Sequence, residues 1–179
     1  MTRPMFVVVL TGSECTGKTT LATQIAGAFG APQSSEYARE YLDGKGGALD
    51  AADVEPIARG QIRVEDAAAA TAAELLVKDT DLVSTMVYAR HYYGHCPPWI
   101  AKAARRRRGD LYLLLHPDVP WVPDGLQRDR PVDRAELHEL FRTALAEVGA
   151  RVVDIEGSWT ERRTRAFAAI ERERGSLSK

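Results

Sequence analysis

Cysteine is scarce in this sequence: the 179 residues include only Cys15 and Cys96, far apart in the chain. Two such thiols do not make a disulfide framework, which favours a reducing cytoplasm as the location. Long apolar runs are also missing, and no stretch approaches the roughly 18 apolar residues that a membrane span needs. The N-terminus lacks the pattern of a secretory signal peptide. We therefore expect a soluble cytoplasmic protein with no membrane partner.

Net charge is equally small. The chain has 24 Lys and Arg residues against 25 Asp and Glu residues, which leaves a formal net charge of −1. This balance argues against nonspecific electrostatic binding to nucleic acid. There is no internal repeat and no long linker, and 45% hydrophobic residues suffice for one buried core and hardly for two. We predict a single domain over residues 1–179, with a homodimer as a possible assembly.

What the sequence does contain is a phosphate-binding loop. The stretch GSECTGKT fits G-x-x-x-x-G-K-[ST] without a mismatch. An apolar run precedes it and apolar residues at helical spacing follow it, as expected between a buried strand and a helix. Backbone N–H groups and the helix dipole would hold the phosphates of ATP. The expected nucleotide contacts are Gly12, Ser13, Glu14, Cys15, Thr16, Gly17, Lys18, Thr19 and Thr20.

Three side chains are expected to carry charge and metal at this loop. Lys18 would reach the β- and γ-phosphates, and Thr19 would offer its hydroxyl to Mg²⁺. Asp79 follows a later apolar stretch and would be the second metal ligand. Asp81, two residues on, would face the same way if the strand pitch continues, toward an acceptor hydroxyl. The predicted cofactors are therefore ATP and Mg²⁺.

Strand-like and helix-like segments alternate along the chain. Strands are expected at 6–11, 33–36, 75–78, 110–115 and 151–155. Helical patterns run over 17–29, up to about 42, and over 53–73, 82–93, 98–107, 134–148 and 160–174. This alternation predicts an α/β fold of the P-loop NTPase type, a five-stranded parallel sheet with helices on both faces, as in nucleoside and nucleotide kinases. Ligands of such sheets lie at the carboxyl ends of the strands.

Two such ends carry further candidates. After the second strand, Glu36 could orient or deprotonate an acceptor hydroxyl, and Arg39 could grip a phosphate or sugar oxygen. After the fourth strand, a loop at about 116–132 is rich in Pro, Gly and Arg and is predicted to be a lid. Its Arg128 and Arg130 would neutralise charge developing between donor and acceptor. Trp121 could stack on a ring or anchor the loop.

Five blocks in this order resemble the ribosylnicotinamide kinase domain of bacterial NadR-type proteins, within the P-loop nucleoside kinases. They are GSECTGKTTL, SEYARE, ARGQ at Ala58–Gln61, DTD at Asp79–Asp81, and WVPDGL at Trp121–Leu126. The resemblance implies an ATP-dependent kinase that phosphorylates the 5′-hydroxyl of nicotinamide riboside for NAD biosynthesis. It implies a nucleoside site that includes Glu36, Tyr37, Arg39, Gln61, Asp81 and Trp121. The nucleotidyltransferase domain of bifunctional members has no counterpart here, so we expect a stand-alone kinase domain.

The identity of the acceptor stays open at this point. Two aromatic positions of the family pattern fall here on Ser35 and around Glu65–Asp66, so another nucleoside or a small alcohol remains an alternative. A 5′-hydroxyl polynucleotide kinase would use the run Arg105–Arg108 along a phosphate backbone, although arginines at a helix end commonly cap carbonyls. A third hypothesis is a nucleotide-binding regulatory switch that has no acceptor. His91 and His95 lie one helical turn apart, and helix packing explains them more simply than zinc.

Overall fold

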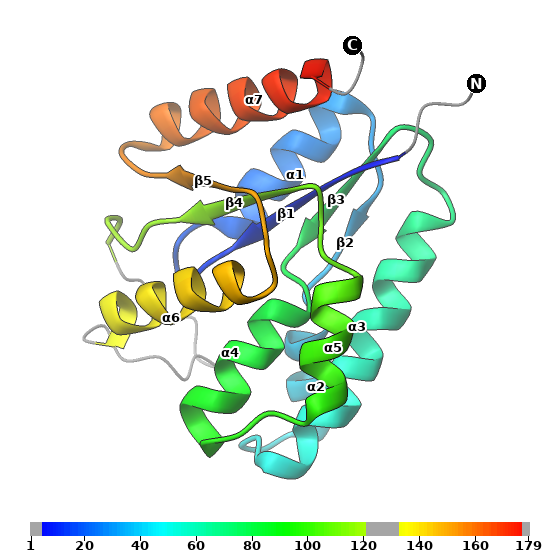
Figure 1. Ribbon diagram of the computed structural model, residues 1–179, viewed down its shortest axis with the longest axis vertical. Coiled ribbons are helices and arrows are strands. Elements are labelled where there is room, and N and C mark those ends of the chain that lie inside the picture. The colour runs from blue at the N-terminus through cyan, green and yellow to red at the C-terminus, as the bar shows by residue number, and fades with distance from the viewer. Residues whose placement is uncertain (1–4, 121–132, 177–179) are drawn as a thin grey trace.

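The computed structural model describes residues 5–120 and 133–176. Its strands are β1 (Phe6–Thr11), β2 (Gln33–Ser34), β3 (Leu75–Asp79), β4 (Leu111–Leu115) and β5 (Val152–Ile155). Its helices are α1 (Lys18–Phe29), α2 (Tyr37–Lys45), η1 (Ala51–Asp53, a single 3₁₀ turn), α3 (Val54–Ala69), α4 (Leu82–Tyr93), α5 (Pro98–Arg106), α6 (Arg134–Glu147) and α7 (Trp159–Ser176). All neighbouring strands are parallel and follow the order β2-β3-β1-β4-β5, which confirms the predicted sheet (Figure 1).

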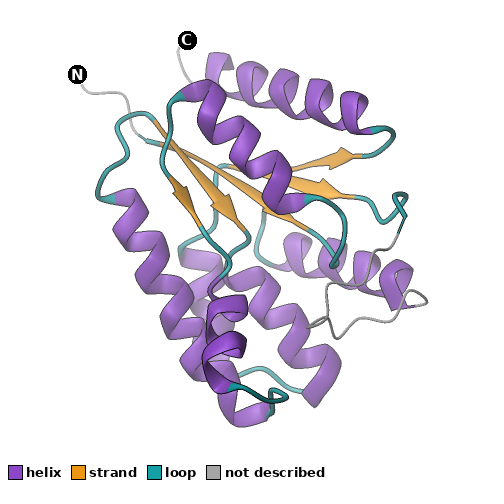
Figure 2. Ribbon diagram, turned by 180° about the vertical axis from the view of Figure 1, so that it is seen from behind, coloured by secondary structure: helices purple, strands orange, loops and turns teal. Residues whose placement is uncertain are grey.

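Helices cover both faces of this sheet, as Figures 1 and 2 show from opposite sides. Because side chains alternate along a strand, Val8 and Leu10 of β1 pack with α1 and α7, whereas Val9 packs with the helices α3 to α6. The same alternation in β4 sends Leu113 to the first core and Tyr112 to the second. A sheet buried on both faces explains why its strands read as nearly continuous apolar runs.

The order of the strands places the ligand crevice. From β1 the chain moves to β2 and β3 on one side, then crosses β1 to reach β4 and β5 on the other. The carboxyl end of β1 is thus the point where the winding reverses, which is where α/β sheets of this kind bind ligands. The register sets Leu10 of β1 opposite Asp79 of β3, so the phosphate loop and Asp79 emerge side by side.

Several element boundaries differ from the sequence expectation by a few residues. The second strand ends at Ser34, and Glu36 is already the N-cap of α2. The helix expected to reach residue 73 ends at Ala69. Most of the expected lid, with Trp121, Arg128 and Arg130, lies outside the described residues. Within residues 5–120 and 133–176, no helix is long and apolar enough to cross a bilayer.

Candidate active site

The phosphate loop adopts a tight curve between β1 and α1. Gly12 and Gly17 have φ angles of 131° and 85°, and Cys15 has a φ of 55°. The Lys18 ammonium lies across the loop and donates to the Ser13 carbonyl oxygen at 2.7 Å. The Ser13 hydroxyl is buried without a hydrogen-bond partner among the described residues. Since N-terminal helix N–H groups also point here, the loop has the form of an anion-binding cradle.

Thr19 and Asp79, the predicted metal ligands, are brought together beside this cradle. Thr19 Oγ1 donates to Asp79 Oδ2 at 2.6 Å, while the other carboxylate oxygen, Oδ1, is buried without a hydrogen-bond partner in the described structure. Burial raises the pKa of Asp79; the Thr19 hydrogen bond and the Lys18 charge oppose this, and the Glu36 charge adds to it. A hydroxyl next to a carboxylate with an unused oxygen is a donor set that suits Mg²⁺.

Asp81 does not lie where the sequence placed it. The strand ends at Asp79, and Thr80 has a φ of 69°, a left-handed conformation that is rare for a β-branched residue. The strand pitch therefore does not continue, and Asp81 turns away from the side of the sheet that Asp79 faces. The expectation that Asp79 and Asp81 share a face is wrong, because it assumed two more residues of regular strand.

Both oxygens of Asp81 are used inside the protein. Oδ1 accepts from the Val83 amide at 2.9 Å, which caps α4, and Oδ2 accepts from the Tyr112 hydroxyl at 2.6 Å. Burial raises the pKa of this carboxyl to about 6, and the Glu65 charge contributes. Asp81 is not among the described residues that line the pocket next to the phosphate loop. In this geometry it is a buried cap, without contact to an acceptor site.

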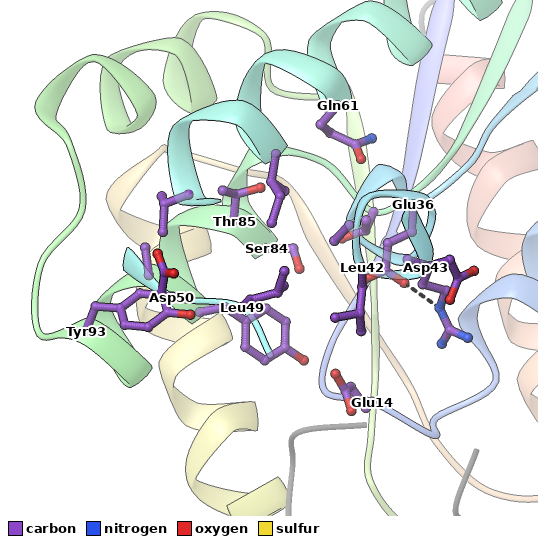
Figure 3. A pocket seen from close by; sticks show the side chains of 17 residues that line it. Glu14, Glu36, Leu42, Asp43, Leu49, Asp50, Gln61, Ser84, Thr85 and Tyr93 are labelled. Atoms are coloured by element: carbon purple, nitrogen blue, oxygen red, sulfur yellow. Dashed lines mark hydrogen bonds and ion pairs between the residues drawn. The ribbon is translucent and has the colours of Figure 1, made fainter. Parts of the chain in front are cut away.

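That pocket has a volume of about 190 Å³ and lies between the phosphate loop and the helices α2, α3 and α4 (Figure 3). Among the described residues, its charged lining consists of one cation and four carboxylates: Arg39, Glu14, Glu36, Asp43 and Asp50. Arg39 Nε donates to Glu36 Oε2 at 3.0 Å. The predicted pair from the SEYARE block thus reaches the pocket wall, and the surplus of carboxylates favours a positively charged ligand.

Helix α4 forms a wall of this pocket that was not expected from the sequence. Its Ser84 and Thr85 offer hydroxyls, and Tyr88 and Tyr93 offer aromatic rings. The signal was present as aromatic residues at helical spacing in "YARHYY", but only the packing of α4 against α3 decides which of them face the cavity. These rings stand in a pocket whose expected aromatics, at Ser35 and Glu65–Asp66, are absent from the sequence.

The residues at those two positions have structural partners instead. Glu65 is buried and accepts from Lys78 Nζ at 2.7 Å, which joins α3 to β3. The neighbouring Asp66 accepts from Arg107 Nη2 at 2.5 Å. The Ser35 carbonyl oxygen accepts from the Gln61 amide at 3.4 Å. These positions therefore hold elements together and supply no ring to the pocket.

Gln61 and Tyr37, both expected near the substrate, fix the turn that carries Glu36. Gln61 is buried, lines the pocket, and accepts from the Tyr37 backbone amide at 3.0 Å. The Tyr37 ring lies against Gly60, where a Cβ atom would overlap it. Tyr37 itself is not among the described pocket-lining residues. Their observed contacts hold the start of α2 against α3.

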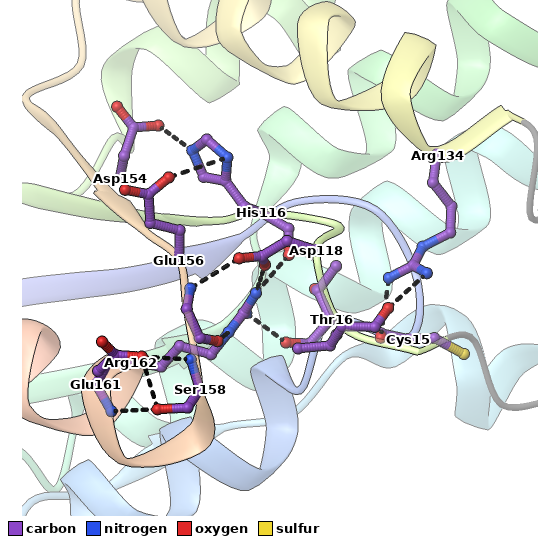
Figure 4. Close-up of polar contacts among 12 residues, drawn as sticks. Cys15, Thr16, His116, Asp118, Arg134, Asp154, Glu156, Ser158, Glu161 and Arg162 are labelled. Carbon is purple, nitrogen blue, oxygen red and sulfur yellow. Dashed lines mark hydrogen bonds and ion pairs between the residues drawn. The ribbon is translucent and has the colours of Figure 1, made fainter.

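Two buried arginines, neither expected from the sequence, brace the phosphate loop from the side of α6 and α7 (Figure 4). Arg162 of α7 donates to the Thr16 carbonyl at 3.1 Å and to the His116 carbonyl at 2.8 Å, and it also pairs with Asp118. Arg134 of α6 donates to the carbonyls of Val119 at 2.9 Å and Cys15 at 3.3 Å. Charged residues buried this way satisfy carbonyls that a curved loop leaves unpaired.

Trp159 is a further residue that was not expected from the sequence. It begins α7, is 59% exposed, and packs so closely on the phosphate loop that a Cβ at Gly17 would lie 2.5 Å from its ring. A cavity of about 270 Å³ beside it is also lined by Thr20, Leu21 and Gln24 of α1. The signal was its place shortly after the fifth strand, at the carboxyl edge of the sheet.

The arginine run at the end of α5 is occupied by internal contacts. Arg105 donates to the Glu147 carbonyl at 2.9 Å, Arg108 donates to the Arg105 carbonyl at 3.0 Å, and Arg107 pairs with Asp66. Capping of carbonyls, the simpler expectation, accounts for Arg105 and Arg108, whereas Arg107 is held in an ion pair.

The class of protein follows from this geometry: a phosphate loop at the switch point of a 2-3-1-4-5 parallel sheet defines a P-loop protein with the fold of nucleoside and nucleotide kinases. Residues 7–162 match the AAA domain family, and the chain belongs to it.

Among known proteins, the chain is 34% identical over 161 residues to the trifunctional NAD biosynthesis/regulator protein NadR of Escherichia coli (strain K12). That alignment takes in 86% of this chain and 39% of NadR, so the chain spans about two fifths of the length of this relative.

Solved NadR structures show the same fold. A NadR protein in complex with NR superposes with a TM-score of 0.86 at 30% identity, over 96% of this chain and 52% of that one. A NadR protein in complex with NAD and AMP-PNP gives a TM-score of 0.76 at 27% identity, over 94% and 49% of the two chains. The resemblance to the NadR kinase region is thereby confirmed, and it supports the class of ATP-dependent kinases.

Proposed function

We propose that this protein is an ATP-dependent kinase that transfers the γ-phosphate to the 5′-hydroxyl of nicotinamide riboside, in the service of NAD synthesis. The position of Glu36 carries the proposal. Its carboxylate lines the pocket of about 190 Å³, and its charge also acts on Asp79 beside the phosphate loop. A carboxylate at the junction of a phosphate site and a neighbouring pocket is where a kinase needs to orient its acceptor.

The transfer would proceed by in-line attack of the acceptor oxygen on the γ-phosphorus, with ADP as the leaving group. Glu36 orients the hydroxyl and takes its proton, and Arg39 holds that carboxylate through the 3.0 Å contact. Lys18 neutralises charge on the transferring group. Thr19 and Asp79 would hold Mg²⁺, which supplies charge neutralisation between the β- and γ-phosphates.

The lining of the pocket supports a pyridinium nucleoside as the acceptor. Nicotinamide attached to ribose carries a positive charge on its ring. Four carboxylates against one guanidinium favour such a ligand, and the surplus stays negative even though Lys45 pairs with Asp50 at 3.3 Å. The rings of Tyr88 and Tyr93 provide faces for cation–π contact. The NadR complex with NR supports the same choice. The two tyrosines would stand in for the aromatic residues that Ser35 and Glu65 do not provide.

We further propose that the adenine of ATP stacks on the exposed ring of Trp159. If the phosphate loop holds the triphosphate of ATP, the adenosine part would extend past Thr20 into the cavity of about 270 Å³ beside this tryptophan. A base stacked on an indole ring gains about 1–3 kcal/mol. The NadR complex with AMP-PNP supports the proposal that this protein binds an adenine nucleotide.

The test is a product screen by mass spectrometry with MgATP and a mixed panel of nicotinamide riboside, common nucleosides, small alcohols and a 5′-hydroxyl oligonucleotide. We expect phosphorylated nicotinamide riboside. Another phosphorylated product would reassign the acceptor, and a phosphorylated oligonucleotide would favour the polynucleotide kinase. ATP binding without any product would favour the regulatory switch.

Two variants connect the product to the site. Lys18→Ala should abolish transfer while the protein remains folded. Glu36→Gln should lower turnover by about a hundredfold or more, in line with loss of a general base, while ATP binding is retained. Glu40→Gln, an exposed carboxylate four residues further along, is the matched control and should behave like the parent. Equal loss in both glutamine variants would show that Glu36 has no special role.

A further inference from the structure

Two histidines and an aspartate meet where β4 and β5 end beside α6, away from the acceptor pocket. His116 follows β4, Asp154 lies in β5, and His138 lies in α6. In the described part of the chain, these three are the group whose metal-ligating atoms all fall within 4.8 Å of one another. His116 Nε2 is 2.8 Å from Asp154 Oδ1, and the two imidazole rings have centroids 4.2 Å apart. Figure 4 shows His116 turned toward Asp154.

Hydrogen bonding determines which nitrogen of His138 offers a lone pair. Arg142 Nη2 lies 3.3 Å from His138 Nε2. A guanidinium can only donate, so Nε2 must accept and Nδ1 must carry the proton. His138 is 5% exposed, and its Nδ1 is buried without a hydrogen-bond partner in the described structure. His138 is therefore a buried neutral imidazole whose Nε2 lone pair points at a cation. A histidine that binds a metal ion presents its lone pair in the same way.

The cation at that point is the side chain of Arg142. The same Nη2 atom donates to Asp154 Oδ1 at 2.7 Å, so one position is shared by a histidine nitrogen and a carboxylate oxygen. The Arg142 side chain is 43% exposed and can move into solvent. His116 donates its Nε2 proton to the same carboxylate. Three possible metal ligands thus lie within 4.8 Å of one another, and Arg142, a partly exposed side chain, occupies the place between His138 and Asp154.

We propose that His116, His138 and Asp154 form a binding site for a divalent late transition metal such as Zn²⁺, which displaces the Arg142 guanidinium. Two imidazole nitrogens and one carboxylate oxygen are a ligand set that zinc accepts, with water free to complete the tetrahedron. On binding, His116 loses its Nε2 proton to solvent and takes one up at Nδ1, so that the imidazole stays neutral. That Nδ1–H faces Glu156, whose Oε2 is 3.9 Å away and can orient the ring.

This site differs in chemistry and place from the Mg²⁺ position proposed at Thr19 and Asp79. Imidazole ligands select zinc, nickel or copper, whereas hydroxyl and carboxylate oxygens with phosphate select magnesium. The metal would join the ends of β4 and β5 to α6. His116 is also linked through its carbonyl to Arg162, which braces the phosphate loop at Thr16. The bound metal would therefore stabilise the wall that supports the loop, independently of which acceptor the kinase uses.

The experiment is a Zn²⁺ titration of the full chain without an affinity tag, after removal of metals with a chelator, in competition with a chromophoric chelator. We expect one tight site per chain. His116→Gln and His138→Gln should each weaken it by at least about tenfold. Arg142→Ala should bind at least as tightly as the parent, because the competing cation is gone. Circular dichroism identifies any variant that does not fold, and the partly exposed His116 keeps the test valid if His138→Gln fails.

His91→Gln and Cys96→Ser are the matched controls, since both residues lie away from the site and should leave the affinity unchanged. Visible absorption of the Co²⁺-loaded protein should show a tetrahedral spectrum that His116→Gln loses. The proposal is overturned if the parent takes up no zinc, if the affinity of His116→Gln equals that of the parent, or if Arg142→Ala weakens binding.

Discussion

Thr19 and Asp79 are 60 residues apart in the chain, yet the threonine hydroxyl donates to the aspartate at 2.6 Å. The contact exists because β1 and β3 are neighbours in the sheet and both end at the phosphate loop. It leaves Asp79 Oδ1 without a partner among the described residues and buried, at a point where burial raises the pKa of the carboxyl. A buried carboxylate oxygen without a hydrogen-bond partner lowers the stability of the fold. Such an oxygen is also available to a ligand such as a metal ion.

Replacing Asp79 by asparagine tests that pairing. Asp79→Asn should lower phosphoryl transfer by about tenfold or more and raise the Mg²⁺ concentration at half-maximal rate, because a metal ligand loses its charge. Its unfolding free energy at pH 7 should equal or exceed that of the parent, since the buried charge is removed. Turnover against Mg²⁺ concentration and urea denaturation measure the two effects. Unchanged Mg²⁺ dependence would remove Asp79 from the metal site.

The Asp81 carboxyl predicts a specific pH dependence of stability. Its folded pKa of about 6 lies above the ordinary value of 3.8, so the folded protein holds a proton that the unfolded chain has lost between these two pH values. The stability that Asp81 contributes is complete below about pH 4 and is lost as the pH rises through about 6. A pKa difference of this size between the folded and unfolded states corresponds to about 3 kcal/mol of unfolding free energy.

Asp81→Asn isolates this contribution because asparagine does not titrate and still accepts from the Val83 amide. Relative to the variant, the parent should lose about 2.5 kcal/mol of unfolding free energy between pH 4 and pH 7, which is most of the full difference. Urea denaturation of both proteins at several pH values gives the difference directly. Parallel curves for the two proteins would mean that Asp81 titrates normally.

Gly60 should be intolerant of a methyl group. In Gly60→Ala the new Cβ would overlap the Tyr37 ring, which must move and take the Glu36 turn with it. We expect a loss of about 1–3 kcal/mol in stability and a fall in turnover. Gly44 is also helical and has no atom within 4 Å of a built Cβ, so Gly44→Ala is the matched control. It should stabilise α2 by up to about 1 kcal/mol. Similar effects in both variants would indicate that helix propensity alone governs them.

Trp159 should matter for the base of the nucleotide and not for its phosphates. Trp159→Ala is expected to weaken ATP binding by about tenfold, as loss of one stacking contact would, while affinity for inorganic triphosphate stays the same. Isothermal titration with both ligands gives this comparison. Trp99→Ala serves as the control, because that ring packs on Arg59, donates to Glu55 and lies outside the cavity. Equal losses for both ligands would point to a displaced loop.

The phosphate loop, the fold class and part of the site were predictable from the sequence because each depends on residues close together in the chain. The phosphate-loop motif, the alternation of strands and helices, and the position of Glu36 between a strand and a helix depend on neighbours within a few residues. The five parallel strands and their covering helices followed from that alternation. Asp79 could be assigned to the loop because the ends of parallel strands meet along one edge of the sheet.

Contacts between distant segments were decided only by the tertiary structure. The left-handed Thr80 turned Asp81 into a cap for α4, and no periodicity in the sequence could have shown it. Packing of α4 on α3 selected the tyrosines that face the pocket. Arg162 reaches Thr16 across 146 residues, and His116, His138 and Asp154 meet from three separate elements. Such contacts depend on how side chains fill space between elements, which the order of residues along one element does not specify.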